Sequence, residues 1–383
     1  MKVGILTFHK SINYGSVLQA FALARKVQAL GHTVEIIDYE PQKYHDIYCL
    51  YHKRPSLRHI LSNLLRRFPA RKAFRNQWQG FRSFAEKHLP VGAKKYFADS
   101  DFSILGTQYD VILCGGDQIW NIHAKDCDDI YFLPTVQDCK KIAYAISVNN
   151  TDFTEPKCTN TLRQWILDFD DISLRESDGC KKLTAFLEID TEIPTAMDPA
   201  FLLAKEDYQT IANTRPVQEP YIFLFSVTFS EDTVRAATVF SQKTGLPVYA
   251  MLSNSKSYKF LRKHSPIRIL PDRLSPEDFL CFLSHAEFVV SNSFHGTAFS
   301  IIYEKEFFII NDRKSDGTFK NDRRLSHILH DLGLNDRFIP ADRITAWESI
   351  PKINYAEVNR RKDASVAQSM KFLKDALNAK ETA

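Results

Sequence analysis

Short apolar runs separated by polar loops and helical stretches recur along the chain. Residues 3–8 form a continuous apolar run typical of a buried strand. The polar loop HKSINYGS follows, then apolar positions at helical spacing over about residues 16–30, which Gly31 ends. Residues 33–39 resume a strand. This βαβ unit predicts a parallel sheet in an α/β protein.

The same alternation continues to the end of the chain. Strand-like runs lie at 110–114, 141–147, 171–174, 221–227, 246–252, 288–293 and 307–312, with helical patterns near 232–243 and 276–284. The segment DPAFLLAKEDYQ reads as a linker. We therefore expect two doubly wound Rossmann-like domains facing a cleft: an N-terminal domain, 1–205, with a basic helical insertion near 50–95, and a C-terminal domain, 206–383, with a terminal helix at 364–379.

Length and composition agree with a two-domain globular protein. The chain has 383 residues, 44% hydrophobic and 25% charged, and its formal charge of +4 is too small to identify a partner. Between residues 53 and 82, however, nine Lys or Arg and no Asp or Glu occur. Apolar positions at helical spacing accompany them: Leu57, Ile60, Leu61, Leu64, Leu65 and Phe68.

This basic amphipathic segment has two interpretations. It is either a solvated face over a buried stripe, which we favour slightly, or a surface for an anionic membrane or an acidic ligand. No nucleic-acid-binding signature accompanies the charge, so we expect no nucleic-acid partner.

Cysteine spacing and hydropathy narrow the class of protein further. Seven cysteines are scattered without a CxxC pair, so we expect neither a zinc site nor a disulfide scaffold, and we expect no cofactor. Apolar runs are too short for a signal peptide or a membrane span. We expect a cytoplasmic protein, with peripheral contact at the inner face of the membrane as an alternative.

Two polar loops of the first half follow strands, where ligands of open α/β sheets bind. In NYGS, formed by Asn13, Tyr14, Gly15 and Ser16, the glycine permits close approach of a ligand to a helix start. In CGGDQIWN, Gly115 and Gly116 do the same, and Asp117 and Asn121 offer hydrogen bonds; a tight turn with Trp120 in the core is the alternative. Without GxGxxG, no dinucleotide site is predicted.

Two further segments carry candidate charges. Arg175, in SLRESD, follows a strand and suits bidentate recognition of a carboxylate or phosphate; a structural ion pair with Glu176 or Asp178 is its alternative. SNSFHGTAFS supplies a second polar turn into a helix, with Ser291, Asn292, Ser293, His295, Gly296 and Thr297. It is either a helix N-cap or the second-domain lip of the cleft, with His295 opposite NYGS.

The ordered set KVGILTFHKSINYGSVLQAFAL, CGGDQIWN, SLRESD, MDPAFLL and SNSFHGTAFSIIYEKEFFII resembles the polysaccharide pyruvyltransferase family over roughly residues 1–335. The resemblance implies a two-domain, glycosyltransferase-B-like arrangement. It also implies transfer of pyruvate from phosphoenolpyruvate onto a hydroxyl pair of a sugar, as a cyclic ketal. The expected partners are phosphoenolpyruvate and a glycan or lipid-linked sugar acceptor.

Carried over residue by residue, the resemblance assigns Arg175 to the phosphate or carboxylate of the donor and His295 to proton transfer. We add Asp117 as a base for the sugar hydroxyl. Many members of the family carry Arg-x-His where this chain has Ser293-Phe294-His295. Either Arg323 or Arg324 replaces the missing cation, or the substrate differs.

Two other functions fit the same pattern. A nucleotide-sugar-dependent glycosyltransferase would use the same cleft, and residues 126–129 contain an Asp-x-Asp that could hold a divalent ion, although such acidic clusters usually face solvent. An inactive polysaccharide-assembly protein that has lost Arg-x-His is the other. Labelled phosphoenolpyruvate and labelled nucleotide sugar separate the two enzymes.

Overall fold

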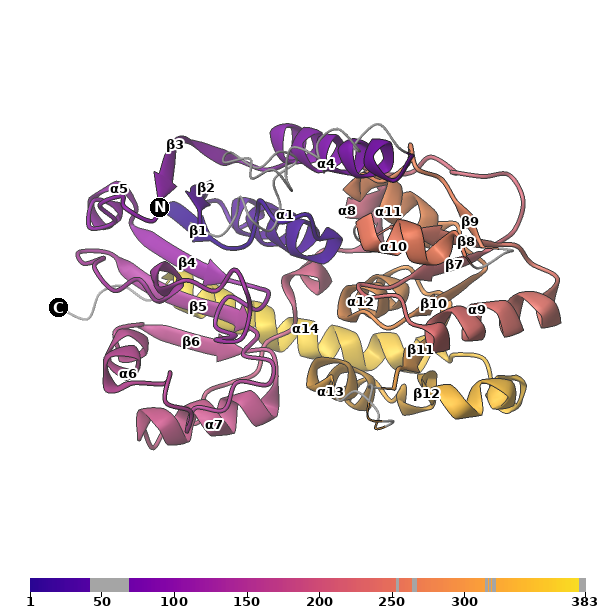
Figure 1. Cartoon of the computed structure of the whole chain (residues 1–383). Helices are drawn as coiled ribbons and strands as arrows, with labels where there is room; N and C mark the ends of the chain where they lie inside the picture. The colour runs from indigo at the N-terminus through magenta and orange to yellow at the C-terminus, as the bar shows by residue number, and fades with distance from the viewer. Residues whose placement is uncertain are drawn as a thin grey trace.

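A computed structural model describes residues 1–41, 69–252, 255–263, 267–313, 316, 318 and 322–378. It contains two parallel six-stranded sheets flanked by helices (Figure 1). The first has the order β3 (Val91–Phe97), β2 (Thr33–Glu40), β1 (Lys2–Leu6), β4 (Val111–Gly115), β5 (Lys140–Ile146), β6 (Asp171–Leu174). The second has the order β12 (Phe338–Pro340), β11 (Glu306–Asn311), β10 (Phe288–Ser291), β7 (Ile222–Phe225), β8 (Val248–Met251), β9 (Arg268–Ile269).

Helices cover the faces of both sheets. They are α1 (Tyr14–Ala29), α4 (Pro69–His88), α5 (Leu105–Gln108), α6 (Asn160–Leu167), α7 (Ser177–Leu187), α8 (Lys205–Gln209), α9 (Glu231–Thr244), α10 (Ser255–Leu261), α11 (Pro276–Ser284), α12 (Phe294–Ile302), α13 (Arg323–Asp331) and α14 (Tyr355–Asn378). Short 3₁₀ turns are η2 (Asp129–Phe132), η3 (Pro199–Leu202), η4 (Asn335–Arg337) and η5 (Ala341–Ser349).

Each sheet has the doubly wound strand order, so the prediction of two Rossmann-like units is confirmed. The direction of winding reverses between β1 and β4 in the first sheet and between β7 and β10 in the second. Strands such as β4 and β7 are continuous apolar runs because both faces of a parallel sheet are covered, and every residue in them is buried. The loops after β1, β4, β7 and β10 therefore border the two crevices where ligands of such sheets bind.

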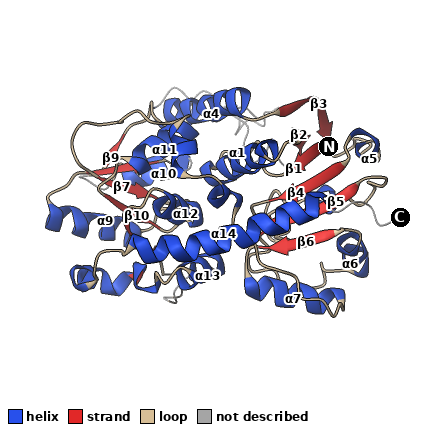
Figure 2. Cartoon of the chain, turned by 180° about the vertical axis from the view of Figure 1, so that it is seen from behind, coloured by secondary structure: helices blue, strands red, loops and turns tan. Residues whose placement is uncertain are grey.

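Two helices connect the two sheets. Helix α4 belongs to the first half but packs against the second, where Gln77 Nε2 donates to Leu252 O over 2.8 Å. Helix α14 runs back from the second sheet to the first (Figures 1 and 2), where Met197 N donates to Ser369 Oγ over 2.9 Å. The terminal helix is longer than the predicted 364–379. The division at residue 205 stays a prediction.

The predicted basic helix lies largely outside the described residues, since 42–68 are not described. Its described part belongs to α4, where Ala73, Gln77, Phe81 and Phe84 are buried, while Lys72, Arg75 and Arg82 are exposed. This part is a solvated face over a buried stripe. In the described part of the chain, no helix combines the length and the hydropathy needed to cross a membrane.

Candidate active site

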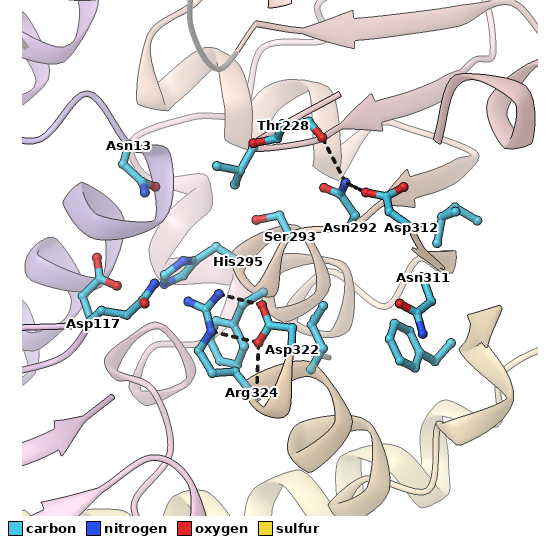
Figure 3. A pocket seen from close by; sticks show the side chains of 16 residues that line it. Asn13, Asp117, Thr228, Asn292, Ser293, His295, Asn311, Asp312, Asp322 and Arg324 are labelled. Carbon is cyan, nitrogen blue, oxygen red and sulfur yellow. Dashed lines mark hydrogen bonds and ion pairs between the residues drawn. The ribbon is translucent and has the colours of Figure 1, made fainter. Parts of the chain in front are cut away.

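A cavity of about 210 Å³, here called the front cavity, lies between the switch points of the two sheets (Figure 3). Asn13 and Asp117 reach it from the loops after β1 and β4. From the second half come Asn292, Ser293 and His295, around the start of α12, and Arg324, at the start of α13. The structure thus brings six predicted site residues, from segments far apart in the sequence, to one cavity.

The ring of His295 lies directly over Gly15. A Cβ atom on Gly15 would stand 1.9 Å from His295 Nδ1 and 2.1 Å from its Cγ, so no side chain fits there. Gly15 occupies the first turn of α1, which Asn13 caps by accepting a hydrogen bond from Gly15 N at 3.0 Å. His295 occupies the first turn of α12. The glycine is therefore required because the starts of two helices, one from each half, meet here.

His295 and Arg175 converge on a single carboxylate. Arg175 Nη2 lies 2.6 Å from Asp198 Oδ2, and His295 Nε2 lies 3.3 Å from the same oxygen. All three residues are buried. Burial alone would raise the pKa of Asp198, but the adjacent Arg175 and His295 outweigh it and lower that pKa to about 2. Asp198 is consequently a permanent anion that joins a residue of each half.

Sequence reasoning did not identify Asp198. It belongs to MDPAFLL, which was interpreted as family resemblance and linker. In the structure it caps η3, because its Oδ1 accepts a hydrogen bond from Ala200 N at 2.8 Å. The cap holds the carboxylate in place while Oδ2 faces the two cations. The sequence offered one signal, since Asp followed by Pro is typical of the start of a helical turn. That signal predicts the capping role of Asp198 but not its contacts with Arg175 and His295.

The ion-pair alternative for Arg175 is wrong in its partners. Glu176 is buried and accepts a hydrogen bond from Ser147 Oγ at 2.5 Å, and burial raises its pKa above the ordinary value. Asp178 instead forms an ion pair with Arg323. Arg175 therefore pairs with Asp198 rather than with Glu176 or Asp178, and it does not line the front cavity.

Arg324, not Arg323, brings its charge to the cavity. Its guanidinium pairs with Asp322 through two bonds of 3.0 and 2.7 Å, and Arg324 lines the front cavity (Figure 3). It lies 5.8 Å from the centre of the Phe294 ring, while Arg175 lies 4.8 Å from the same centre. Arg323 points elsewhere, to Asp178 on α7. The guanidinium groups of Arg175 and Arg324 therefore both lie close to the ring of Phe294.

Asp117 sits in a tight turn at the edge of the front cavity. It has a φ of 51°, and its carboxylate accepts a hydrogen bond from Ser16 Oγ. Gly116, with a φ of 65°, has no room for a Cβ, which would stand 1.7 Å from Gln19 Oε1. The tight-turn alternative is confirmed, because Trp120 is in the core and donates to Tyr131 O over 2.9 Å. Ligand binding by this segment stays a prediction.

Other predicted binding residues lie beneath the cavity surface. Tyr14 is buried between the halves, stacked on Phe279 with ring centres 5.2 Å apart, and its hydroxyl donates to Leu252 O at 3.1 Å. Ser293 caps α12 by accepting from Gly296 N, so the N-cap interpretation also holds. The other predicted residues that do not line the front cavity are Gly15, Ser16, Gly115, Gly116, Asn121, Arg175, Ser291, Gly296, Thr297 and Arg323.

No metal centre is evident in the part of the chain that the structure describes. No group of three or more His, Cys, Asp or Glu residues there could hold a metal ion. Of the Asp-x-Asp motif, Asp128 accepts a hydrogen bond from Tyr39 Oη at 2.8 Å.

Solved structures define the class of the fold. The chain is similar to the UDP-GlcNAc 2-epimerase of Methanocaldococcus jannaschii in complex with UDP-GlcNAc and UDP (TM-score 0.53, 12% identity, covering 97% of this chain and 100% of that one). It is also similar to the UDP-GlcNAc 2-epimerase of Neisseria meningitidis bound to UDP-GlcNAc (TM-score 0.53, 10% identity, 98% and 99%). The fold is glycosyltransferase-B-like, as predicted. At these identities, the likeness concerns the fold alone.

The sequence itself identifies the family. The sequence model of the polysaccharide pyruvyl transferase family matches residues 13–313, more than three quarters of the chain. The chain therefore belongs to the polysaccharide pyruvyl transferase family. No curated protein matches the chain in sequence.

Proposed function

We propose that the protein is a ketal pyruvyltransferase that moves pyruvate from phosphoenolpyruvate onto a hydroxyl pair of a surface polysaccharide or its lipid-linked precursor. One observation carries the proposal: Arg175 and His295, from different halves, meet at Asp198 beside the start of α12. Phosphoenolpyruvate carries a phosphate and a carboxylate. Guanidinium groups and the unpaired amides of a helix start suit both.

Arg324 supplies the cation that the family places at position 293. Its guanidinium borders the same cavity as Ser293 and stands across the Phe294 ring from Arg175. Because Arg324 is already paired with Asp322, it is held in position rather than free to rotate. The donor would thus meet Arg175 and Arg324 in place of an arginine on α12 itself.

The reaction needs two proton transfers. The C2–O bond to phosphate breaks, two bonds form between C2 and the sugar oxygens, and C3 becomes a methyl group. Of the two protons lost by the hydroxyls, one is matched by the proton gained at C3 and the other leaves with phosphate. Charge and atoms balance without an oxidant or reductant.

His295 and Asp117 are placed for these transfers. Nδ1 of His295 is covered by Gly15, and Nε2 is buried 3.3 Å from Asp198 Oδ2, which stabilises the imidazolium. To give a proton to C3, the ring would have to turn from Asp198 toward the front cavity, which His295 lines. Asp117 borders the front cavity from the opposite side and would accept the proton of the first sugar hydroxyl.

A nucleotide-sugar donor fits the second sheet less well. Its diphosphate would be expected at a helix start near the switch point between β7 and β10. Helix α9 follows β7 and carries Glu231 and Asp232 in its first turn. Asp312 lies against the same turn, accepting from Thr233 Oγ1 at 2.7 Å. These carboxylates disfavour a diphosphate at the start of α9. Asp312 also lines the front cavity, so its charge does not distinguish the two donors there.

The test is incubation with phosphoenolpyruvate and a panel of glycosides, followed by ³¹P and ¹H NMR. The proposal predicts one phosphate released for each new ketal methyl group. Parallel incubation with UDP-sugars should leave them unchanged; their consumption without loss of phosphoenolpyruvate would favour the glycosyltransferase. We expect the reaction in the cytoplasm, and contact of residues 53–82 with the membrane stays a prediction.

A further inference from the structure

A second cavity, here called the rear cavity, lies on the other side of Phe294. It measures about 50 Å³ and is lined by Arg175, by Asp198, and by residues of α13 and α14. Phe294 and Arg324 line both cavities and so form the partition between them. A single water needs roughly 10–15 Å³ on this measure, so the rear cavity has room for a few waters or one small ion.

The side chain that makes this cavity unusual is Arg175. It is only 5% exposed, yet none of its three guanidinium nitrogens makes a well-oriented hydrogen bond within the described residues. Its Nη2 has an ion-pair contact with Asp198, which leaves the donors of Nε and Nη1 unmatched. Buried donors without acceptors are costly, and a guanidinium fork matches two oxygens of one oxyanion.

The rest of the lining supplies further donors. Arg324 contributes a second guanidinium, and His327 of α13 lies beside it. Helix α14 adds the hydroxyl of Ser365 and the amide of Gln368. The carboxylates of this cavity are engaged: Asp198 with Arg175, and Asp331, 3.3 Å from His327 Nε2.

We propose that the rear cavity is a subsite for one phosphate-sized oxyanion, held by the fork of Arg175 and enclosed by α14. The α13 and α14 residues lie beyond the segment matched by the family, so they are contributed by this chain's terminal helices. Two sources share this chemistry. One is the phosphoryl group of the donor, an assignment that rests on the proposed function; the other is inorganic phosphate.

Charge placed on α14 tests the subsite without altering Arg175 or His295. Gln368→Glu puts a carboxylate into the lining, and Ala367→Glu puts the same charge on the neighbouring exposed position, which does not line the cavity. Ser365→Asp and Ala364→Asp form a second matched pair. Binding of inorganic phosphate and of phosphoenolpyruvate is measured by isothermal titration calorimetry, which requires no turnover.

We expect the two lining variants to weaken phosphate binding by about five- to tenfold relative to their controls, through like-charge repulsion. If the subsite holds the donor, the lining variants should bind phosphoenolpyruvate more weakly as well, and phosphoenolpyruvate should displace phosphate from the protein. If it holds inorganic phosphate, only phosphate binding weakens and phosphoenolpyruvate binds beside it. Absence of phosphate binding to the wild-type protein, or equal affinities of lining and control variants, would overturn the proposal. Failure of ketal formation overturns the proposed function instead, because phosphate binding is read separately.

Discussion

The substitution Gly15→Ala adds a single methyl group, and the structure predicts that it causes a large loss of catalytic rate. The added methyl group would stand 1.9 Å from His295 Nδ1. Ordinary van der Waals contact begins near 3.4 Å, so the imidazole and the methyl group must separate by about 1.5 Å. His295 lies in the first turn of α12, and its Nε2 is only 3.3 Å from Asp198. The displacement therefore moves the proton donor away from its partner.

The magnitude follows from this displacement. Misplacing a reacting group by about 1 Å can cost on the order of a hundredfold in rate. We expect Gly15→Ala to lower kcat at least about a hundredfold, which corresponds to ~2.7 kcal/mol of activation free energy. Donor affinity should change far less, because the three atoms nearest the new methyl group all belong to His295 rather than to Arg175 or Arg324.

The assay pairs turnover with thermal unfolding. Gly245→Ala is the control: Gly245 has a φ of 72° and nothing within 4 Å of its missing Cβ. Alanine is strained there by about 1–2 kcal/mol, so that variant should lose stability and keep its turnover per folded molecule. Parental turnover in a normally folded Gly15→Ala protein would refute the placement of His295 over Gly15.

Three further predictions concern the site. His295→Gln should lower kcat by roughly two to four orders of magnitude with donor affinity, measured by calorimetry, unchanged; ketal formation at the parental rate would remove His295 from the mechanism. Arg324→Ala should raise the KM for phosphoenolpyruvate about tenfold or more, Ser293→Arg should restore it in part, and Arg323→Ala, the control, should leave it unchanged. Burial raises the pKa of Glu176 in the folded protein above its ordinary value of 4.5. Above pH 4.5 the unfolded chain therefore loses a proton that the folded protein keeps, so the free energy of unfolding falls as the pH rises. Glu176→Gln should flatten the curve of Tm against pH above about pH 4.5; a curve parallel to the wild type would contradict a raised pKa.

The sequence pattern predicts the chain order of strands and loops, and with it the approach of NYGS to SNSFHG. Continuous apolar runs bounded by polar turns identify buried parallel strands, and the doubly wound order places the loops after β1 and β10 at the switch points of the two sheets. Gly15 was predicted for a close approach to a ligand. The structure shows that the group approaching it is His295.

Tertiary contacts decide what local pattern cannot. The sequence predicts Tyr14 as a residue of the cleft. In the structure its hydroxyl donates to the carbonyls of Leu252 and Leu274, which lie far along the chain. Arg323 and Arg324 are equivalent by type, and the 100° turn between consecutive helical residues sends one to Asp178 and the other to the cavity.

The partners of Asp198 were equally hidden. Arg175 lies at the end of β6 and His295 lies in α12, and the linker stands between these two elements in the sequence. Only the packing of the two halves brings Arg175 and His295 to one carboxylate.

The most direct test of the account is the isotope content of the product. The reaction is run in D₂O with phosphoenolpyruvate and a glycoside that serves as acceptor, and the ketal methyl group is examined by NMR and mass spectrometry. If an exchangeable protein group such as the imidazolium of His295 protonates C3, each methyl group should carry one deuterium, with one phosphate released per ketal. A ketal methyl group without deuterium, or phosphoenolpyruvate left intact while a nucleotide sugar is consumed, would contradict the account.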